Sequence, residues 1–137
     1  MINSRGWRAA EIPAANGHTT ARALARLYGA LARGGEIDSV QVMKPEQIRN
    51  CYREESYGTD EVLLITTRFS TGFMLTQPND QWGPNARTFG HPGAGGSLGF
   101  ADPEAKVGFG YTMNKMGSGI IIDPRARALF DAVYASL

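Results

Sequence analysis

The chain has 137 residues, a length that suits one domain built around one hydrophobic core. Hydrophobic residues make up 42% of the sequence and charged residues 20%, which is the composition of an ordinary globular protein. The 14 basic residues nearly balance the 13 acidic ones and are scattered along the chain, which argues against nucleic acid or a membrane as a partner.

The first half of the chain predicts two helices after an irregular start. Residues 1–19 contain turn signals and are expected to be irregular. Apolar residues then recur at three- and four-residue steps, which predicts an amphipathic helix over residues 20–33, ended by Gly34–Gly35. The residues of this apolar stripe are Leu24, Leu27, Tyr28 and Leu31. The run VQVMKPEQIRNCY predicts a short extended piece and a second helix, with its proline in the first turn.

The second half predicts an antiparallel sheet and a closing helix. From Glu61 onward the apolar residues alternate or form solid runs, and turn clusters separate the strand-like segments. These segments are EVLLITTRFSTGFMLTQ, RTFGH, GSLGFAD and KVGFGYTMNKM. A hairpin is expected at Asp102–Ala105, and a final helix is expected to begin with Asp123 as its cap and Pro124 as its first residue. Residues 1–137 are therefore interpreted as a single domain of the α+β class.

Several residues that can carry chemistry are expected to be structural instead. Cys51 is the only cysteine, and no Cys/His cluster has the spacing of a zinc site, so neither a metal nor another cofactor is predicted. His18 is interpreted as a loop or helix-cap residue, and Trp7 and Trp82 as packing residues. No signal peptide and no run of about 18 apolar residues is visible, so a cytoplasmic location is the default expectation.

The glycine-rich run from Phe89 to Glu104 raises the question of whether Ser97 is a nucleophile. Residues 95–99 match the pattern G-x-S-x-G, but a nucleophile elbow requires a helix after the serine and a histidine further along the chain. A strand-like run follows instead, and both histidines precede Ser97. A dinucleotide fingerprint also fails, because Leu98 stands where its last glycine is required. Ser97 is therefore interpreted as a small residue on a packed strand.

The run FGHPGAGGSLGFADP, residues 89–103, resembles the third active-site motif of serine β-lactamase-like hydrolases. This group includes class C β-lactamases, penicillin-binding proteins and β-lactamase-fold esterases. His91-Pro92-Gly93 stands where the family carries Lys-Thr-Gly or its His-x-Gly replacement. The helical passage upstream and the last strand and helix downstream extend the resemblance over essentially the whole chain. It implies the C-terminal part of the β-lactamase/transpeptidase-like fold.

The resemblance also implies roles for the residues of this motif. The backbone amide of Ala94 is expected to be one donor of an oxyanion hole, and His91 is expected to line the cleft. A glycine-rich strand lets a substrate lie against the backbone without colliding with side chains. The residues assigned to the site are His91, Gly93 and Ala94 as catalytic and His91, Pro92, Gly95 and Gly96 as substrate-binding.

Two other motifs of the family are missing from the sequence. No serine is followed by a lysine three positions later, and no tyrosine is followed by an asparagine two positions later. We therefore expect the chain to be a C-terminal portion that is inactive alone. It would act on a small ester or amide when an N-terminal segment completes it, and it would form an oligomer or pair with a complementing chain. The alternative is a non-catalytic remnant of the same fold that binds a small ligand or a partner.

Overall fold

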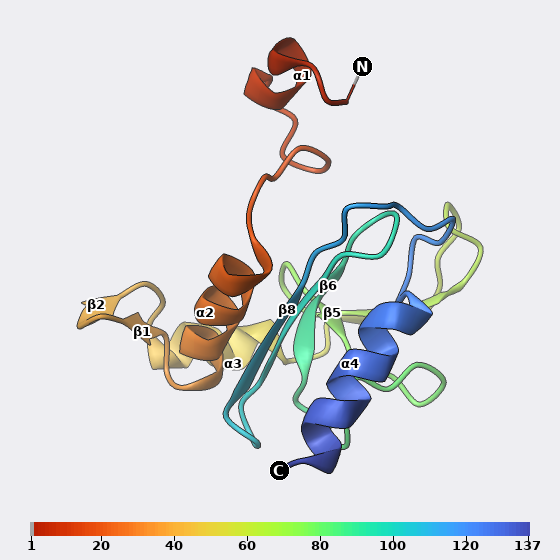
Figure 1. Ribbon diagram of the computed structural model, residues 1–137. Helices are drawn as coiled ribbons and strands as arrows, with labels where there is room; N and C mark the ends of the chain where they lie inside the picture. The colour runs from red at the N-terminus through yellow and green to blue at the C-terminus, as the bar shows by residue number, and fades with distance from the viewer. Residues whose placement is uncertain (1) are drawn as a thin grey trace.

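The computed structural model describes residues 2–137 and is built around a six-stranded antiparallel sheet with the strand order β3-β4-β5-β6-β7-β8. The strands are β3 (Ser56–Thr59), β4 (Thr66–Phe69), β5 (Met74–Leu75), β6 (Phe89–Pro92), β7 (Leu98–Asp102) and β8 (Val107–Tyr111). Helix α2 (Ala21–Ala32) covers one face of the sheet, and α4 (Pro124–Ala135) packs on the other (Figure 1). The predicted α+β class is confirmed.

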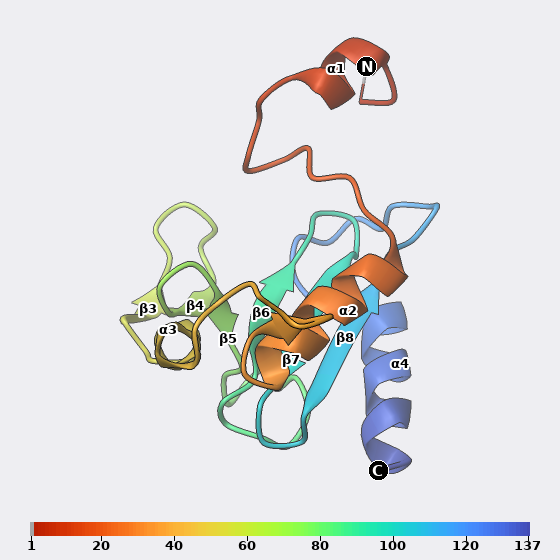
Figure 2. The ribbon, with the colours of Figure 1, turned by 90° about the vertical axis from the view of Figure 1, so that its left-hand side faces the viewer.

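The remaining elements lie at the periphery. Helix α3 (Pro45–Cys51) and a small hairpin of β1 (Glu36–Ile37) and β2 (Val40–Gln41) follow α2 along the chain. A short helix, α1 (Arg5–Ala9), stands on an arm that projects away from the sheet (Figures 1 and 2). None of the described helices is long and apolar enough to cross a membrane.

The predicted ends of the longer helices agree with the observed ones. The Thr20 hydroxyl accepts a hydrogen bond from the Ala23 N–H at 3.2 Å and so caps α2. Gly34 and Gly35 follow α2 with φ angles of 100° and 87°, a conformation that only glycine adopts without strain. The carboxylate of Asp123 caps α4 in the same manner, with Pro124 as the first helical residue.

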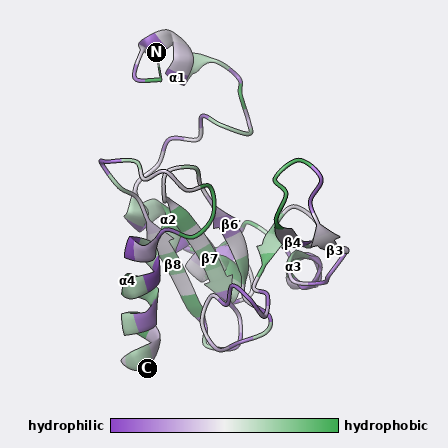
Figure 3. Ribbon diagram, turned by 90° about the vertical axis from the view of Figure 1, so that its right-hand side faces the viewer, coloured by the Kyte–Doolittle hydropathy of each residue, from purple (hydrophilic) through white to green (hydrophobic). Residues whose placement is uncertain are grey.

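Two predictions of local structure are wrong. Residues 5–9 were expected to be irregular but form α1, because the Ser4 hydroxyl accepts from the Trp7 N–H at 3.2 Å and closes a first turn. The strand expected from Glu61 begins only at Thr66. The chain turns between β3 and β4, because the Asp60 carboxylate accepts hydrogen bonds from two backbone N–H groups. Val62 and Leu64 are exposed in this loop, which is coloured as hydrophobic in Figure 3.

Glycines on β7 and β8 let α2 lie directly on the sheet. A Cβ atom on Gly108 would overlap the backbone of Gly29 in α2, and one on Gly110 would meet the backbone of Ala21 and Ala25. The two backbones therefore approach more closely than ordinary side chains allow. This face of the sheet carries the first core cluster, whose fully or nearly buried residues include Leu31, Leu75, Phe89 and Ala101.

The opposite face is an aromatic core beneath α4. The Phe100 ring stacks on Phe109 with centroids 5.0 Å apart and meets Phe130 edge to face at 5.6 Å. Trp82 is 1% exposed and belongs to the same cluster, so its interpretation as a packing residue is confirmed. All five residues of β7 are buried between the two helical layers.

A buried carboxylate joins three parts of this core. Asp102 is fully buried, and its Oδ2 accepts from the Tyr134 hydroxyl at 2.6 Å and from the Asn85 amide at 2.8 Å. Its Oδ1 accepts from the backbone N–H groups of Glu104 and Ala105, which forms the predicted hairpin between β7 and β8. One side chain therefore fixes the hairpin, the loop before β6 and the end of α4.

This arrangement predicts a graded loss of stability. Tyr134→Phe removes one donor and is expected to lower the free energy of unfolding by about 1 kcal/mol. Asp102→Ala leaves four donors without their acceptor and is expected to cost about 3 kcal/mol. Urea unfolding followed by circular dichroism measures both values, with the exposed Tyr57→Phe as the neutral control. A smaller effect of Asp102→Ala than of Tyr134→Phe would contradict this account.

Candidate functional site

The end of β6 has a strand partner on one side only. Strand β7 pairs with all four residues of β6, from Phe89↔Ala101 to Pro92↔Leu98. Strand β5 pairs only with Phe89 and Gly90. The sheet therefore has an open edge at His91 and Pro92.

The direction of the backbone at this edge follows from the hairpin that comes next. Gly93 N–H donates to the Ser97 carbonyl at 2.7 Å, so the backbone groups of Gly93 face β7. Backbone groups alternate in direction along a strand, and those of Pro92 therefore face the open edge. The Pro92 carbonyl lies 2.7 Å from the Nδ1 of His91, whose N–H donates to it.

The turn from Gly93 to Ser97 leaves the N–H groups of Ala94 and Ser97 without an acceptor among residues 2–137. Gly96 N–H donates to the Gly93 carbonyl at 2.9 Å, and Gly95 and Gly96 have φ angles of 84° and 119°. Ala94 is exposed at the tip of this turn, and its N–H donates to no acceptor within residues 2–137. Of these two residues only Ala94 is exposed, so its N–H is the better placed of the two for a ligand oxygen.

A second loop, between β8 and α4, holds the turn in place. Gly95 N–H donates to the Gly119 carbonyl at 2.9 Å, and Gly117 N–H donates to the Gly95 carbonyl at 2.7 Å. The Arg125 guanidinium also donates to the Gly95 carbonyl, at 3.3 Å, and forms an ion pair with Asp123. Hydrogen bonds from Arg125 lower the pKa of Asp123 to about 2, so this brace remains charged at neutral pH.

Beside the open edge, α2 and the β6–β7 hairpin enclose a groove of about 370 Å³. Its lining includes three of the predicted site residues, namely His91, Pro92 and Gly93. Gly95 and Gly96 do not line it, because both are buried beneath Met116 and Asp123 of the second loop. Ala94 stands at the tip of the turn rather than in the wall of the groove.

The groove also contains residues that the sequence did not assign to a site. His18 lines it from the N-terminal arm, with its Nδ1 held 2.6 Å from the Asn16 carbonyl and its ring edge-on to Trp7. Tyr28 and Leu24 of α2 line it as well, and we call Tyr28, the more buried of the two, the base of the groove. A single sequence carries no signal for these contacts, because they depend on how the arm and α2 lie against β6.

Ser97 lines the groove without the geometry of a nucleophile elbow. It directly precedes β7, so a strand follows it where an elbow has a helix. Its hydroxyl occupies the space that a side chain on Gly93 would need. Ser97 is thus a small, half-buried residue just before the strand on which the sequence placed it, and a side chain on Gly93 would force its hydroxyl to turn away.

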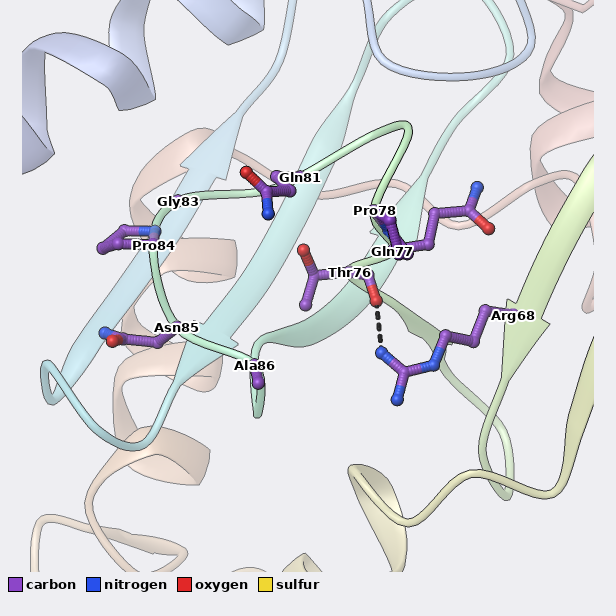
Figure 4. A pocket seen from close by; sticks show the side chains of 9 residues that line it. All are labelled: Arg68, Thr76, Gln77, Pro78, Gln81, Gly83, Pro84, Asn85 and Ala86. Carbon is purple, nitrogen blue, oxygen red and sulfur yellow. Dashed lines mark hydrogen bonds between the residues drawn. The ribbon is translucent and has the colours of Figure 1, made fainter.

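A separate cavity of about 180 Å³ lies beneath the loop between β5 and β6 and is drawn in Figure 4. Arg68 enters it from β4 and donates to the Thr76 carbonyl at 2.6 Å, and its Nε donates to Glu54 at 2.7 Å. None of its lining residues belongs to the groove. Arg68 therefore braces the loop, and its charge is already paired.

The burial of Tyr28 at the base of the groove predicts a loss of stability in alkali. Burial raises its pKa from 10.0 to about 12. Between these values the unfolded chain releases the phenolic proton while the folded chain keeps it, so the free energy of unfolding falls as the pH rises, by about 1 kcal/mol per pH unit. The pKa of Tyr134 is raised as well, by burial and then by the Asp102 hydrogen bond, which adds in the same direction.

Urea unfolding from pH 9 to about pH 11.5 measures this dependence. Tyr28→Phe is expected to reduce the slope, and the exposed Tyr57→Phe is expected to leave it unchanged. Equal slopes for the wild type and Tyr28→Phe would contradict the assignment.

The chain is similar in sequence to a known protein family and to a known esterase. Residues 2–132 match the family described as Beta-lactamase. Over 118 residues the chain is 42% identical to the esterase/beta-lactamase LipL of Mycobacterium tuberculosis, a match that covers 85% of this chain and 27% of that protein. The chain therefore spans about a quarter of that relative's length.

Solved structures agree with this match. A family VIII carboxylesterase is 45% identical with a TM-score of 0.93, and a penicillin-binding protein homolog from Caulobacter crescentus is 48% identical with a TM-score of 0.93. EstA from Arthrobacter nitroguajacolicus is 37% identical with a TM-score of 0.81. Each match covers 98% of this chain and 36% of the solved chain.

Proposed function

Since the chain belongs to the beta-lactamase family, we propose that it supplies the His-x-Gly wall and one oxyanion donor of a serine-hydrolase cleft acting on a small ester or amide. The observation that carries this proposal is the Ala94 N–H, which has no acceptor within residues 2–137 and stands next to the open edge of β6. Acyl transfer develops negative charge on a carbonyl oxygen, and a fixed backbone N–H stabilises that charge.

The residues of the motif and of the turn that follows it have different roles in this proposal. Ala94 N–H donates to the carbonyl oxygen of the substrate as the charge develops. His91 donates through Nδ1 to the Pro92 carbonyl, which leaves its Nε2 for the substrate or for the proton network of the cleft. Gly93 has no side chain, so the substrate can approach the backbone at this point. Gly95 and Gly96 act indirectly, by shaping the turn that presents Ala94.

The attacking group belongs to polypeptide outside these 137 residues. The sequence contains neither a Ser-x-x-Lys nor a Tyr-x-Asn motif, and the chain spans only 27–36% of the relatives it matches. A serine hydrolase without its nucleophile keeps only the contribution of binding and of the oxyanion donors. This chain therefore acts as the C-terminal portion of a hydrolase that an N-terminal segment completes.

Strand β8 is the place where that segment joins the sheet. It pairs with β7 on one side and has no strand partner on the other among the described residues. Both of its faces are covered, by α2 and by the aromatic core under α4. A strand held on both faces, with unpaired backbone groups along one edge, is ready to accept another strand from a complementing chain or from a second copy.

A second candidate function uses the same groove without chemistry. The groove is formed by residues of this chain alone, so a small molecule or partner peptide can occupy it when no nucleophile is present. An adjacent upstream reading frame that carries both missing motifs would favour the hydrolase, and its absence would favour the binding protein.

Reconstitution tests the hydrolase directly. The chain alone is expected to give no turnover of a p-nitrophenyl ester, and mixing with a matched N-terminal segment is expected to restore it. In the restored enzyme, Ala94→Pro removes the N–H at a turn position that tolerates proline and should lower kcat by about 10²- to 10³-fold. Ala94→Gly keeps the N–H and serves as the control. Equal activity of the two variants would exclude Ala94 as the oxyanion donor.

Hydrogen exchange tests the role of β8. In the isolated chain at low concentration, the amides on its open edge are expected to exchange much faster than those of β7, which are paired on both sides. Addition of the N-terminal segment should protect them, and size-exclusion chromatography should show association of the chain at higher concentration. A stable monomer whose β8 amides are already fully protected would refute this role.

A further inference from the structure

Tyr28 is a mostly buried residue whose hydroxyl makes no hydrogen bond to any other residue that the structure describes. The residue lies on α2 and is 8% exposed, and burial alone, with no hydrogen bond, raises the pKa of its hydroxyl. Tyr28 nevertheless lines the groove, together with His18 and His91. The hydroxyl oxygen is not among the buried side-chain atoms that lack a partner, which within residues 2–137 are Gln77 Oε1 and Trp82 Nε1. It therefore reaches the surface of the groove, where it can donate to water or to a ligand.

The ring of Tyr28 is fixed in this position. A Cβ atom on Gly99 would overlap the ring, so the ring lies directly on the backbone of β7. On another side it meets Phe73 edge to face, with centroids 6.3 Å apart. These contacts prevent the phenol from turning toward a different acceptor. The hydroxyl is therefore held in place before a ligand arrives, which lowers the cost of binding.

The chemistry of the surrounding groove favours a neutral ligand that carries an oxygen. Burial raises the pKa of Tyr28 to about 12, so its hydroxyl remains a proton donor throughout the neutral range. Nδ1 of His18 is engaged by the Asn16 carbonyl, which leaves Nε2 as a further polar group of the same groove. The lining contains no Asp, Glu, Lys or Arg side chain.

We propose that the Tyr28 hydroxyl is a specificity-determining hydrogen-bond donor at the base of the groove. It selects acyl compounds that carry an alcohol or carbonyl oxygen beyond the reacting carbonyl over compounds of the same size with a purely alkyl chain. The assignment of this subsite to an acyl substrate rests on the proposed function. A site built to hydrogen-bond an oxygen discriminates against the alkyl analogue because its own polar group is then left unpaired.

Two esters of equal size test this selection on the chain as it is. Methyl 4-hydroxybutyrate and methyl pentanoate differ only in a terminal hydroxyl in place of a methyl group. Titration of the ¹⁵N-labelled chain, followed by NMR, is expected to show about tenfold tighter binding of the hydroxy ester. Tyr28→Phe keeps the ring and should abolish this preference, and Tyr57→Phe, at an exposed position, should retain it.

A second measurement keeps the test decisive if Tyr28→Phe fails to fold. With ¹³Cζ-tyrosine in the wild-type chain, the hydroxy ester is expected to shift the Tyr28 signal, and methyl pentanoate is expected to leave it almost unchanged. Equal binding of the two esters, a preference that survives Tyr28→Phe, or an unshifted Tyr28 signal would each overturn the proposal. None of these readouts involves turnover, so failed reconstitution of activity would refute the hydrolase and leave the selection by Tyr28 standing.

Discussion

The close approach of α2 to the sheet is the constraint on which the rest of the structure depends. Gly108 and Gly110 leave no room for side chains between α2 and β8, and Gly99 leaves none between Tyr28 and β7. Larger residues at these positions would lift the helix away from the strands, and the ring of Tyr28 would no longer form the base of the groove. These three glycines therefore determine how closely α2 and Tyr28 lie to the sheet, and with that the depth of the groove.

The turn that presents Ala94 owes its shape to residues far from it in sequence. Gly95 is hydrogen-bonded to Gly117, Gly119 and Arg125. Arg125 in turn forms an ion pair with Asp123 at the start of α4. The position of one exposed N–H is thus fixed by the loop between β8 and α4. Such pre-organisation is what makes a backbone donor effective, because no reorientation is needed when charge develops on a bound carbonyl.

The elements that can be predicted from the sequence are those determined by residues close together along the chain. The stripe of α2, the cap of α4 at Asp123 and the strands rich in apolar residues were all visible in the sequence. Strand β3 was missed because its four residues are all exposed and show no alternation, and its order comes from pairing with β4. His18 and Tyr28 were not assigned to the site for a related reason. One lies on an arm and the other on a helix, and only the packing of both against β6 and β7 places them in one groove with His91.

Pro92 at the open edge of β6 has a consequence for how the protein behaves among other chains. At this position the backbone has no N–H to offer, and its carbonyl is already occupied by the His91 imidazole. An incoming strand would find neither a donor nor a free acceptor at Pro92, which disfavours edge-to-edge pairing at this point. Pro92 therefore protects the unpaired end of β6 against the addition of another strand.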